Sequence, residues 1–164
     1  MIQRIQSIYL LVVLILSMVT LLSPVLELAS ADAYYELSVR GLERSTAASA
    51  LIAGGEEEQA VVVEHAWMLT LISAIIPLIT LISIWLYKHR QLQIRLTVFN
   101  SLLMLGYYGM YAFYLYYFKE KYAADAVHPL LPAVFPLVCI VLNVLAIRGI
   151  AKDDALVKSY ERLR

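Results

Sequence analysis

The sequence predicts an all-α membrane protein in which four transmembrane helices form a bundle and both termini lie in the cytoplasm. Its 164 residues are 62% hydrophobic and only 16% charged, with a mean hydropathy of +0.74, whereas a soluble domain carries roughly 25% charged residues. Four stretches are long enough to cross a hydrocarbon core of about 30 Å, which takes roughly 20 apolar residues. They are residues 8–26, 66–87, 96–118 and 130–147.

All four stretches are free of Asp, Glu, Lys, Arg and His. Lipid offers no partner to backbone polar groups, so an uninterrupted helix is the expected form of each span. The chain then forms a single membrane domain with an outer loop at 27–65, a cytoplasmic loop at 88–95 and a cytoplasmic tail at 148–164.

The first stretch has an alternative interpretation as a cleaved signal peptide, because "ASADA" at 29–33 offers two A-x-A cleavage patterns. However, its apolar run is longer than the roughly 7–15 residues of a signal core. We therefore expect a retained helix.

Lys and Arg residues predict the orientation, since they are enriched in cytoplasmic loops. One lies in the N-terminus, three in the 88–95 loop and five in the tail, nine in all, against four in the two outer connections. Both termini are therefore expected in the cytoplasm. The long outer loop is acidic.

Within the outer loop, "YYELSVRGL" (34–42) alternates apolar and polar residues, which is typical of a strand, and "AVVVE" (60–64) is a second β-prone stretch. Together they predict a short hairpin over the outer end of the bundle. The acidic run 56–58 lies between them, in a predicted turn. Consecutive side chains diverge in such a turn, which favours a solvated charge run over a cation site.

The tail predicts an amphipathic cytoplasmic helix that begins at Asp153, an N-cap residue. Apolar residues follow at helical spacing: Leu156, Val157, Tyr160 and Leu163. Such a helix would lie in the membrane interface. Docking of a soluble partner is the alternative.

Three motifs carry a family resemblance: "MIQRIQSIYLL" at 1–11, "LYKHRQLQIRL" at 86–96 and "DDALVKSYERLR" at 153–164. With them, the whole chain resembles an uncharacterised Bacteroidota family of small four-span inner-membrane proteins, a domain-of-unknown-function family. The resemblance implies four spans and the inner membrane of a Gram-negative bacterium. It implies no activity, cofactor or catalytic residue.

Cations at the cytoplasmic ends of the spans are the expected contacts of lipid head groups, since they lie at the depth of the phosphates. They are Lys88, Arg90, Arg95 and Arg148. The alternative is that these cations form a pocket for an anionic ligand. His65 and His128 flank spans on the outer side, but their spacing is too loose to predict a metal site.

Inside the spans, the sequence predicts one polar cluster, formed by Tyr107, Tyr108, Tyr111 and Asn143. A buried amide or phenol requires a partner, and Tyr107 and Tyr111 share a helix face at i, i+4. Pro77 is expected to kink the second span beside them. The outer tyrosines of the third span are expected to form an aromatic belt.

No motif for hydrolysis, phosphate binding or metal catalysis occurs. The 13 basic and 13 acidic residues balance, which argues against nucleic-acid binding driven by charge. We therefore expect a non-enzymatic assembly, scaffolding or accessory subunit without cofactor or metal. Its expected partners are membrane lipids and a membrane protein or a second copy. The alternative is a lipid- or small-molecule-binding or transport protein with a pocket between the second, third and fourth spans.

Overall fold

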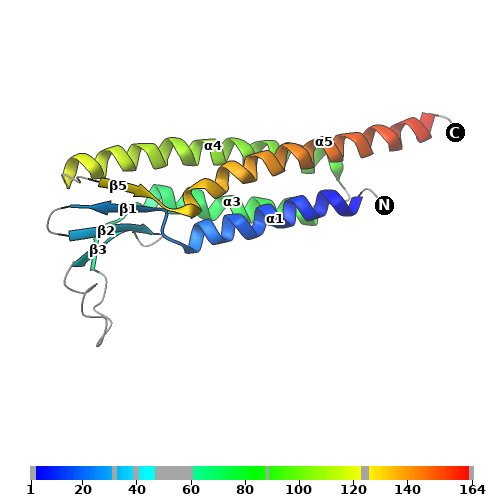
Figure 1. The fold of residues 1–164 in the computed structure, drawn as a ribbon. Coiled ribbons are helices and arrows are strands. Elements are labelled where there is room, and N and C mark those ends of the chain that lie inside the picture. Colours follow the sequence, from blue (N-terminus) through cyan, green and yellow to red (C-terminus); the bar gives the residue numbers. More distant parts are fainter. Residues whose placement is uncertain are drawn as a thin grey trace, which may run out of the picture.

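The computed structural model describes residues 3–30, 33–38, 41–46, 61–87, 89–122 and 126–162. These residues form long helices side by side, with a five-stranded antiparallel sheet at one end (Figure 1). The prediction of an all-α four-span membrane bundle is therefore wrong. The fold is mostly helical but contains a sheet, and only two described helices are long and apolar enough to cross a membrane.

Those two candidate spans are Trp67–Trp85, which is helix α3, and Leu131–Asp153, which joins the short 3-10 helix η1 (Leu131–Val134) to most of α5 (Phe135–Arg162). The other two predicted spans are helical but fall short for different reasons. Helix α1 (Gln3–Leu22) has an apolar part of only 17 residues, Gln6–Leu22. Helix α4 (Arg90–Lys121) is long, but its tyrosines and flanking charges dilute its hydropathy.

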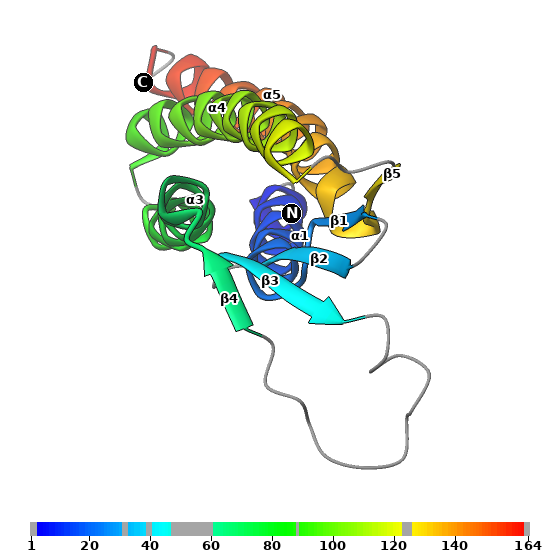
Figure 2. The ribbon, with the colours of Figure 1, turned by 90° about the vertical axis from the view of Figure 1, so that its left-hand side faces the viewer.

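The four long helices pack in a ring, in which α1 and α4 each contact both α3 and α5 (Figure 2). Two predicted boundaries differ from the structure. The loop expected at 88–95 is helical from Arg90 onward. Helix α5 runs without a break through Gly149 and Asp153, so Asp153 does not cap a new helix.

The sheet has the order β4-β3-β2-β1-β5, built from Leu26–Ala29 (β1), Ala33–Ser38 (β2), Gly41–Thr46 (β3), Val61–Glu64 (β4) and Ala126–Pro129 (β5). The predicted strand at 34–42 is in fact two strands, because β2 ends at Ser38 and β3 returns antiparallel from Gly41. The predicted turn at 56–58 lies outside the described residues.

The register separates an apolar face of the sheet from a polar one, because paired residues share a face and successive residues alternate. Leu26 pairs with Leu37, which pairs with Leu42, and all three are fully buried. Glu27, Glu36 and Glu43 pair in the same way on the opposite face.

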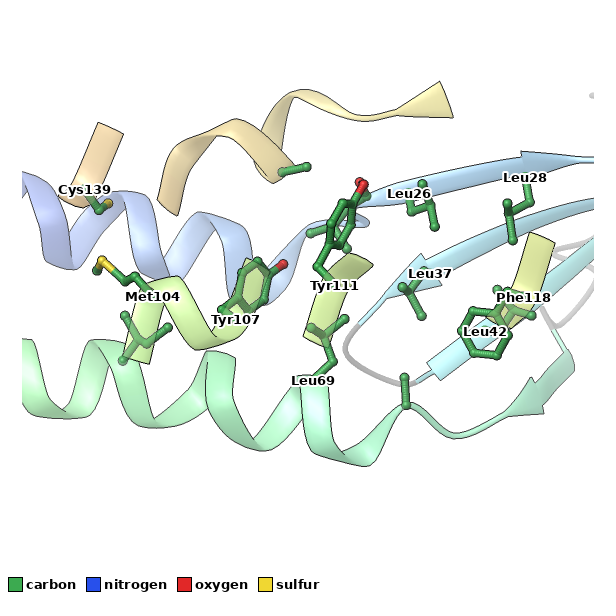
Figure 3. Close-up of a cluster of buried hydrophobic side chains, with 14 of the residues drawn as sticks. Leu26, Leu28, Leu37, Leu42, Leu69, Met104, Tyr107, Tyr111, Phe118 and Cys139 are labelled. Carbon is green, nitrogen blue, oxygen red and sulfur yellow. The ribbon is translucent and has the colours of Figure 1, made fainter. Parts of the chain in front are cut away.

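The outer end of α4 covers the apolar face of the sheet. With 32 residues, α4 is about 48 Å long at 1.5 Å per residue, and it extends past the other helices above the strands (Figure 1). Phe118 is fully buried there in the same cluster as the sheet leucines (Figure 3). The Tyr35 ring of β2 lies 4.7 Å from the ring of Tyr122, which follows α4.

Gly41 occupies a position in the sheet that a larger residue does not fit. Its φ of 125° lies in the region that L side chains rarely adopt, and an added Cβ would meet the backbone oxygen of Glu64. We predict that Gly41→Ala lowers the free energy of unfolding by about 1–3 kcal/mol, through strain and clash together.

Thermal unfolding in detergent measures this loss, and Gly109→Ala is the matched control. A Cβ at Gly109 would meet nothing within 4 Å, and the exchange should stabilise α4 slightly through helix propensity. Equal unfolding midpoints for the two variants would contradict the role of Gly41.

Candidate functional site

The predicted tyrosines lie together on α4, and their rings contact one another. The ring centroids of Tyr107 and Tyr111 are 6.3 Å apart and stacked, as their i, i+4 spacing predicts, and those of Tyr107 and Tyr108 are 5.9 Å apart. Their hydroxyls, however, do not share one partner. The hydroxyls of Tyr108 and Tyr111 bind different parts of the chain.

Tyr108 and Tyr111 bind backbone at the points where the chain enters or leaves a helix. The Tyr108 hydroxyl donates to the Ala133 carbonyl in η1 and accepts from the Leu137 amide in α5, both at 2.9 Å. The Tyr111 hydroxyl donates to the Val25 carbonyl, next to β1, at 3.4 Å. In the described chain the Tyr107 hydroxyl has no hydrogen-bond partner, although its side chain is buried. Two of the three phenols therefore act as structural ties.

Asn143 is fully buried but is not joined to the tyrosines. Its amide nitrogen contacts the Met104 sulfur at 3.7 Å, and its Oδ1 atom has no partner among the described residues. The predicted polar cluster did not include a second buried amide, Asn100, which donates to the Thr80 hydroxyl of α3 at 2.9 Å. Its Oδ1 atom is likewise unpartnered within the described chain. The interior thus holds polar groups in separate pairs.

A small cavity lies at the centre of the helices, lined by residues from all four. It is bounded by Ser73 and Ile76, one turn before and next to Pro77, and by Tyr107, whereas Asn143 does not line it. Its volume is about 10 Å³, which is enough for roughly one water molecule. In this arrangement it has no room for a lipid or a metabolite.

At the end away from the sheet, three helices meet in a polar junction. The Gln6 amide of α1 donates to the Asp153 carboxylate of α5 at 2.8 Å, and both residues are buried. The Arg90 guanidinium, at the start of α4, donates to the Asp153 backbone carbonyl at 3.0 Å. We call Gln6, Arg90 and Asp153 the helix-end junction. One residue comes from each of the three sequence motifs, 1–11, 86–96 and 153–164.

Helix α1 approaches α5 closely at this junction, at Gly149. A Cβ at Gly149 would lie 2.9 Å from Cγ of Gln6.

The cations that were expected to contact lipid head groups lie in different surroundings. Arg90 is engaged in the junction, Arg95 and Arg148 are exposed near the same end, and Lys88 lies outside the described residues.

At the opposite end, a second cluster joins β4 to α4. Lys121 donates to Glu64 at 2.6 Å, and Tyr117 and Tyr122 donate to the same carboxylate at 3.2 and 3.3 Å. The hydrogen bond from Lys121 lowers the pKa of Glu64, and in return the bond to Glu64 raises the pKa of Lys121. The sequence analysis counted both residues only as loop charges, since 57 positions separate them.

The histidines that flank the predicted spans lie at the sheet end. His128 is exposed in β5 opposite Glu27 of β1, and His65 follows β4. Within the described residues, no three side chains of His, Cys, Asp or Glu gather closely enough to hold a metal ion.

The helix-end junction yields a prediction about coupling. Asp153→Ala should cost about 1–3 kcal/mol of unfolding free energy, because it leaves the buried Gln6 amide without its acceptor. A double-mutant cycle with Gln6→Ala, followed by thermal unfolding in detergent, should give a coupling of about 0.5 kcal/mol or more. Lys152→Ala, at an exposed neighbouring position, is the control. Strictly additive effects would refute the contact.

The Glu64 cluster yields a prediction about pH. The pKa of Glu64 is lowered, so its contribution to stability is complete above the ordinary value of 4.5 and is lost as the pH falls through the lowered value. The pKa of Lys121 is raised, so its contribution is complete below 10.5 and is lost as the pH rises through the raised value.

The wild type should therefore unfold at a higher temperature than Glu64→Gln between about pH 5 and 10, and the two should converge in acid. The difference will be modest, since 29% of the Glu64 side chain and 45% of the Lys121 side chain are exposed to screening water. Glu120→Gln, at the same end of α4, controls for the loss of one charge. A difference that persists in acid would rule out the ion pair as its source.

Comparison with known proteins places the chain in a family. The sequence model of the family described as a domain of unknown function (DUF4293) matches residues 2–163. A comparison with curated proteins finds no match. The match includes Gln6, Arg90 and Asp153, the three residues of the helix-end junction. This chain belongs to the family described as a domain of unknown function (DUF4293).

Proposed function

We propose that the protein is a non-enzymatic accessory subunit of the bacterial inner membrane, which assembles with another membrane protein. Helices α3 and α5 cross the lipid, both termini lie in the cytoplasm and the sheet lies on the outer side. The observation that carries this proposal is the exposed apolar surface of the two candidate spans.

Only 33% of the most apolar window of each span is buried. The core helix of a soluble protein would be mostly buried, because water disfavours exposed apolar surface. On α3 and α5 the outward side chains are large and apolar, including Leu78 at 57% and Leu137 at 56% exposure. Neighbouring faces of α1 and α4 continue this surface with Ile15 and Leu102. Lipid is the environment that favours such an exposed apolar surface.

The two ends of the molecule differ in a way that supports the orientation. Helix α1 begins and α5 ends at the end opposite the sheet (Figure 1), so both termini face one side. Arg95 and Arg148 are exposed near that end, as expected for the cytoplasmic side. The sheet end carries the carboxylate row of Glu27, Glu36 and Glu43, of which Glu36 is exposed and the other two are half-buried.

An assembly role is supported by the closed interior and by the outer face of α4. The central cavity, at about 10 Å³, is too small for a substrate. Gly106 and Gly109 lie exposed on α4, and a Cβ at either would meet nothing within 4 Å. Glycine within a helix costs about 1 kcal/mol relative to alanine, and packing inside this chain does not explain it. The close approach of a helix from a partner protein would explain both glycines.

Photo-crosslinking in the native membrane tests this function. A benzoylphenylalanine at Leu105, 63% exposed beside Gly106, should give one recurring protein adduct, which mass spectrometry identifies as a different membrane protein. The same probe at Leu137, of similar exposure on α5, should give mainly lipid adducts. Gly109→Ile should remove the protein adduct without unfolding the chain. Lipid adducts alone at Leu105, or an adduct consisting only of a second copy, would overturn the proposed hetero-assembly.

A further inference from the structure

Helix α3 carries a tryptophan at each end, and these are the two tryptophans of the chain. Trp67 is 61% exposed and Trp85 is 78% exposed. The helix has 19 residues, so its two ends lie about 27 Å apart at 1.5 Å per residue. The hydrocarbon core of a bilayer is about 30 Å thick, and tryptophan is enriched at both of its interfaces with water. The spacing of the two side chains therefore matches the two surfaces of a bilayer core.

Contacts between α3 and α4 extend both levels to the neighbouring helix. The hydroxyls of Ser83 and Thr97 are 3.5 Å apart, and the Asn100 amide donates to the Thr80 hydroxyl at 2.9 Å. The residue numbers of each pair add up to 180, because the two helices are antiparallel and rise equally per residue. The level of any α3 residue on α4 follows from this register.

On the side away from the sheet, two cations lie at the level of Trp85. The register places Arg95 of α4 there. Helix α5 contacts α4 on either side of this position, at Asn143 and at Asp153. Arg148 lies midway between those two contacts and so at the level of Arg95. Both arginines are exposed. Guanidinium groups at this depth bind lipid phosphates, so charge complementarity favours a phospholipid surface here.

The surface between the two levels is apolar. Neither α3 from 67 to 85 nor α5 from 135 to 147 contains Asp, Glu, Lys, Arg or His. Leu78, near the middle of α3, is 57% exposed. Titratable residues resume just outside both ends of α3, at His65 before it and at His89 after it. The uncharged belt therefore ends at the two tryptophans.

Beyond the level of Trp67, α4 projects past the other helices toward the sheet (Figure 1). The register places Phe113, which is 61% exposed, at this level. Helix α4 continues to Lys121, about 12 Å farther at 1.5 Å per residue. Lys121 binds Glu64 there, and the leucines of the sheet are fully buried. An ion pair and a covered apolar face are expected in water and not in hydrocarbon.

We propose that a phospholipid bilayer surrounds the molecule between these two levels. Trp67 lies in the head-group region on the sheet side, and Trp85, at the level of Arg95 and Arg148, lies in the head-group region on the other. The outer end of α4 then holds the sheet clear of the lipid. The proposal rests on the membrane insertion that is part of the proposed function, and adds its depth. It does not depend on a protein partner.

Tryptophan fluorescence tests the depth on the full chain in phosphatidylcholine vesicles. The lipids carry bromine either close to the head group or near the end of the acyl chain, and bromine quenches a tryptophan only at close range. Trp85→Phe leaves Trp67 as the single reporter, and Trp67→Phe leaves Trp85. In both variants the shallow bromine should quench more strongly than the deep bromine, so that the ratio of shallow to deep quenching exceeds one.

Leu78→Trp, with both native tryptophans replaced by Phe, is the matched control. Position 78 is on the same helix and similarly exposed, but it lies near the middle of the belt, so its ratio should fall below one. Lys119→Trp in the same background lies about 9 Å beyond Phe113. It should escape both brominated lipids and be quenched by iodide in the water. These positions are all exposed, so the variants should keep the wild-type unfolding midpoint.

The outcomes separate the depth from the function. A ratio below one for Trp67 or Trp85, with lipid quenching at position 78, would overturn the two boundaries and leave membrane insertion intact. Lipid quenching of Lys119→Trp would show that the sheet is not held clear of the lipid. If lipid quenches none of the positions, water or protein covers the belt, and both insertion and this proposal fail. The protein partner is tested by crosslinking, and its absence would leave the quenching ratios unchanged.

Discussion

The structure depends on the need to cover the apolar face of the sheet. Leu26, Leu28, Leu37 and Leu42 are fully buried on it, and each such side chain contributes about 1.5–3 kcal/mol when removed from water. The strands cannot supply this cover, because they form a single layer. Helix α4 supplies it by continuing beyond the other helices, with Phe118 packed against the leucines. The length of α4 therefore determines where the sheet sits, and the Glu64 cluster holds the two parts in register.

Away from the buried Asp153 at the helix ends, the buried polar side chains of the described helices are uncharged. Hydroxyls of Ser and Thr donate to carbonyls within their own helix, as Thr97 does to Gln93. The hydroxyl donor thereby gains an acceptor without disturbing the packing between helices. The amides cannot do this fully, and Asn100 and Asn143 each leave one buried oxygen unpartnered among the described residues. Such groups favour helix–helix contact, since an exposed amide would be costly in an apolar environment. They hold the helices together, and among the described residues the two amides lie in separate pairs.

Much of the local structure was predictable from the sequence. The apolar runs 66–87 and 130–147 correspond to the two candidate spans, and "AVVVE" contains β4. The i, i+4 pairing of Tyr107 and Tyr111 also follows from helix geometry. The partners of the predicted site residues were not predictable. Asp153 was expected to cap a helix, yet it binds Gln6, 147 positions away. Helical periodicity relates residues that are three or four apart, and it carries no information about such a contact.

By itself, then, the sequence determined which segments avoid water, and in most places which periodicity they adopt, because apolar patterning is a local property. Tertiary structure alone decided that the chain is not an all-α bundle. Strand β1 lies between β2 and β5, although β5 follows it by about a hundred residues, and a four-residue strand containing proline has no distinct local signal. The physical reason is the same for the sheet, the helix-end junction and the central cavity. Hydrophobic patterning shows that a face must be covered, but only packing of the whole chain decides what covers it.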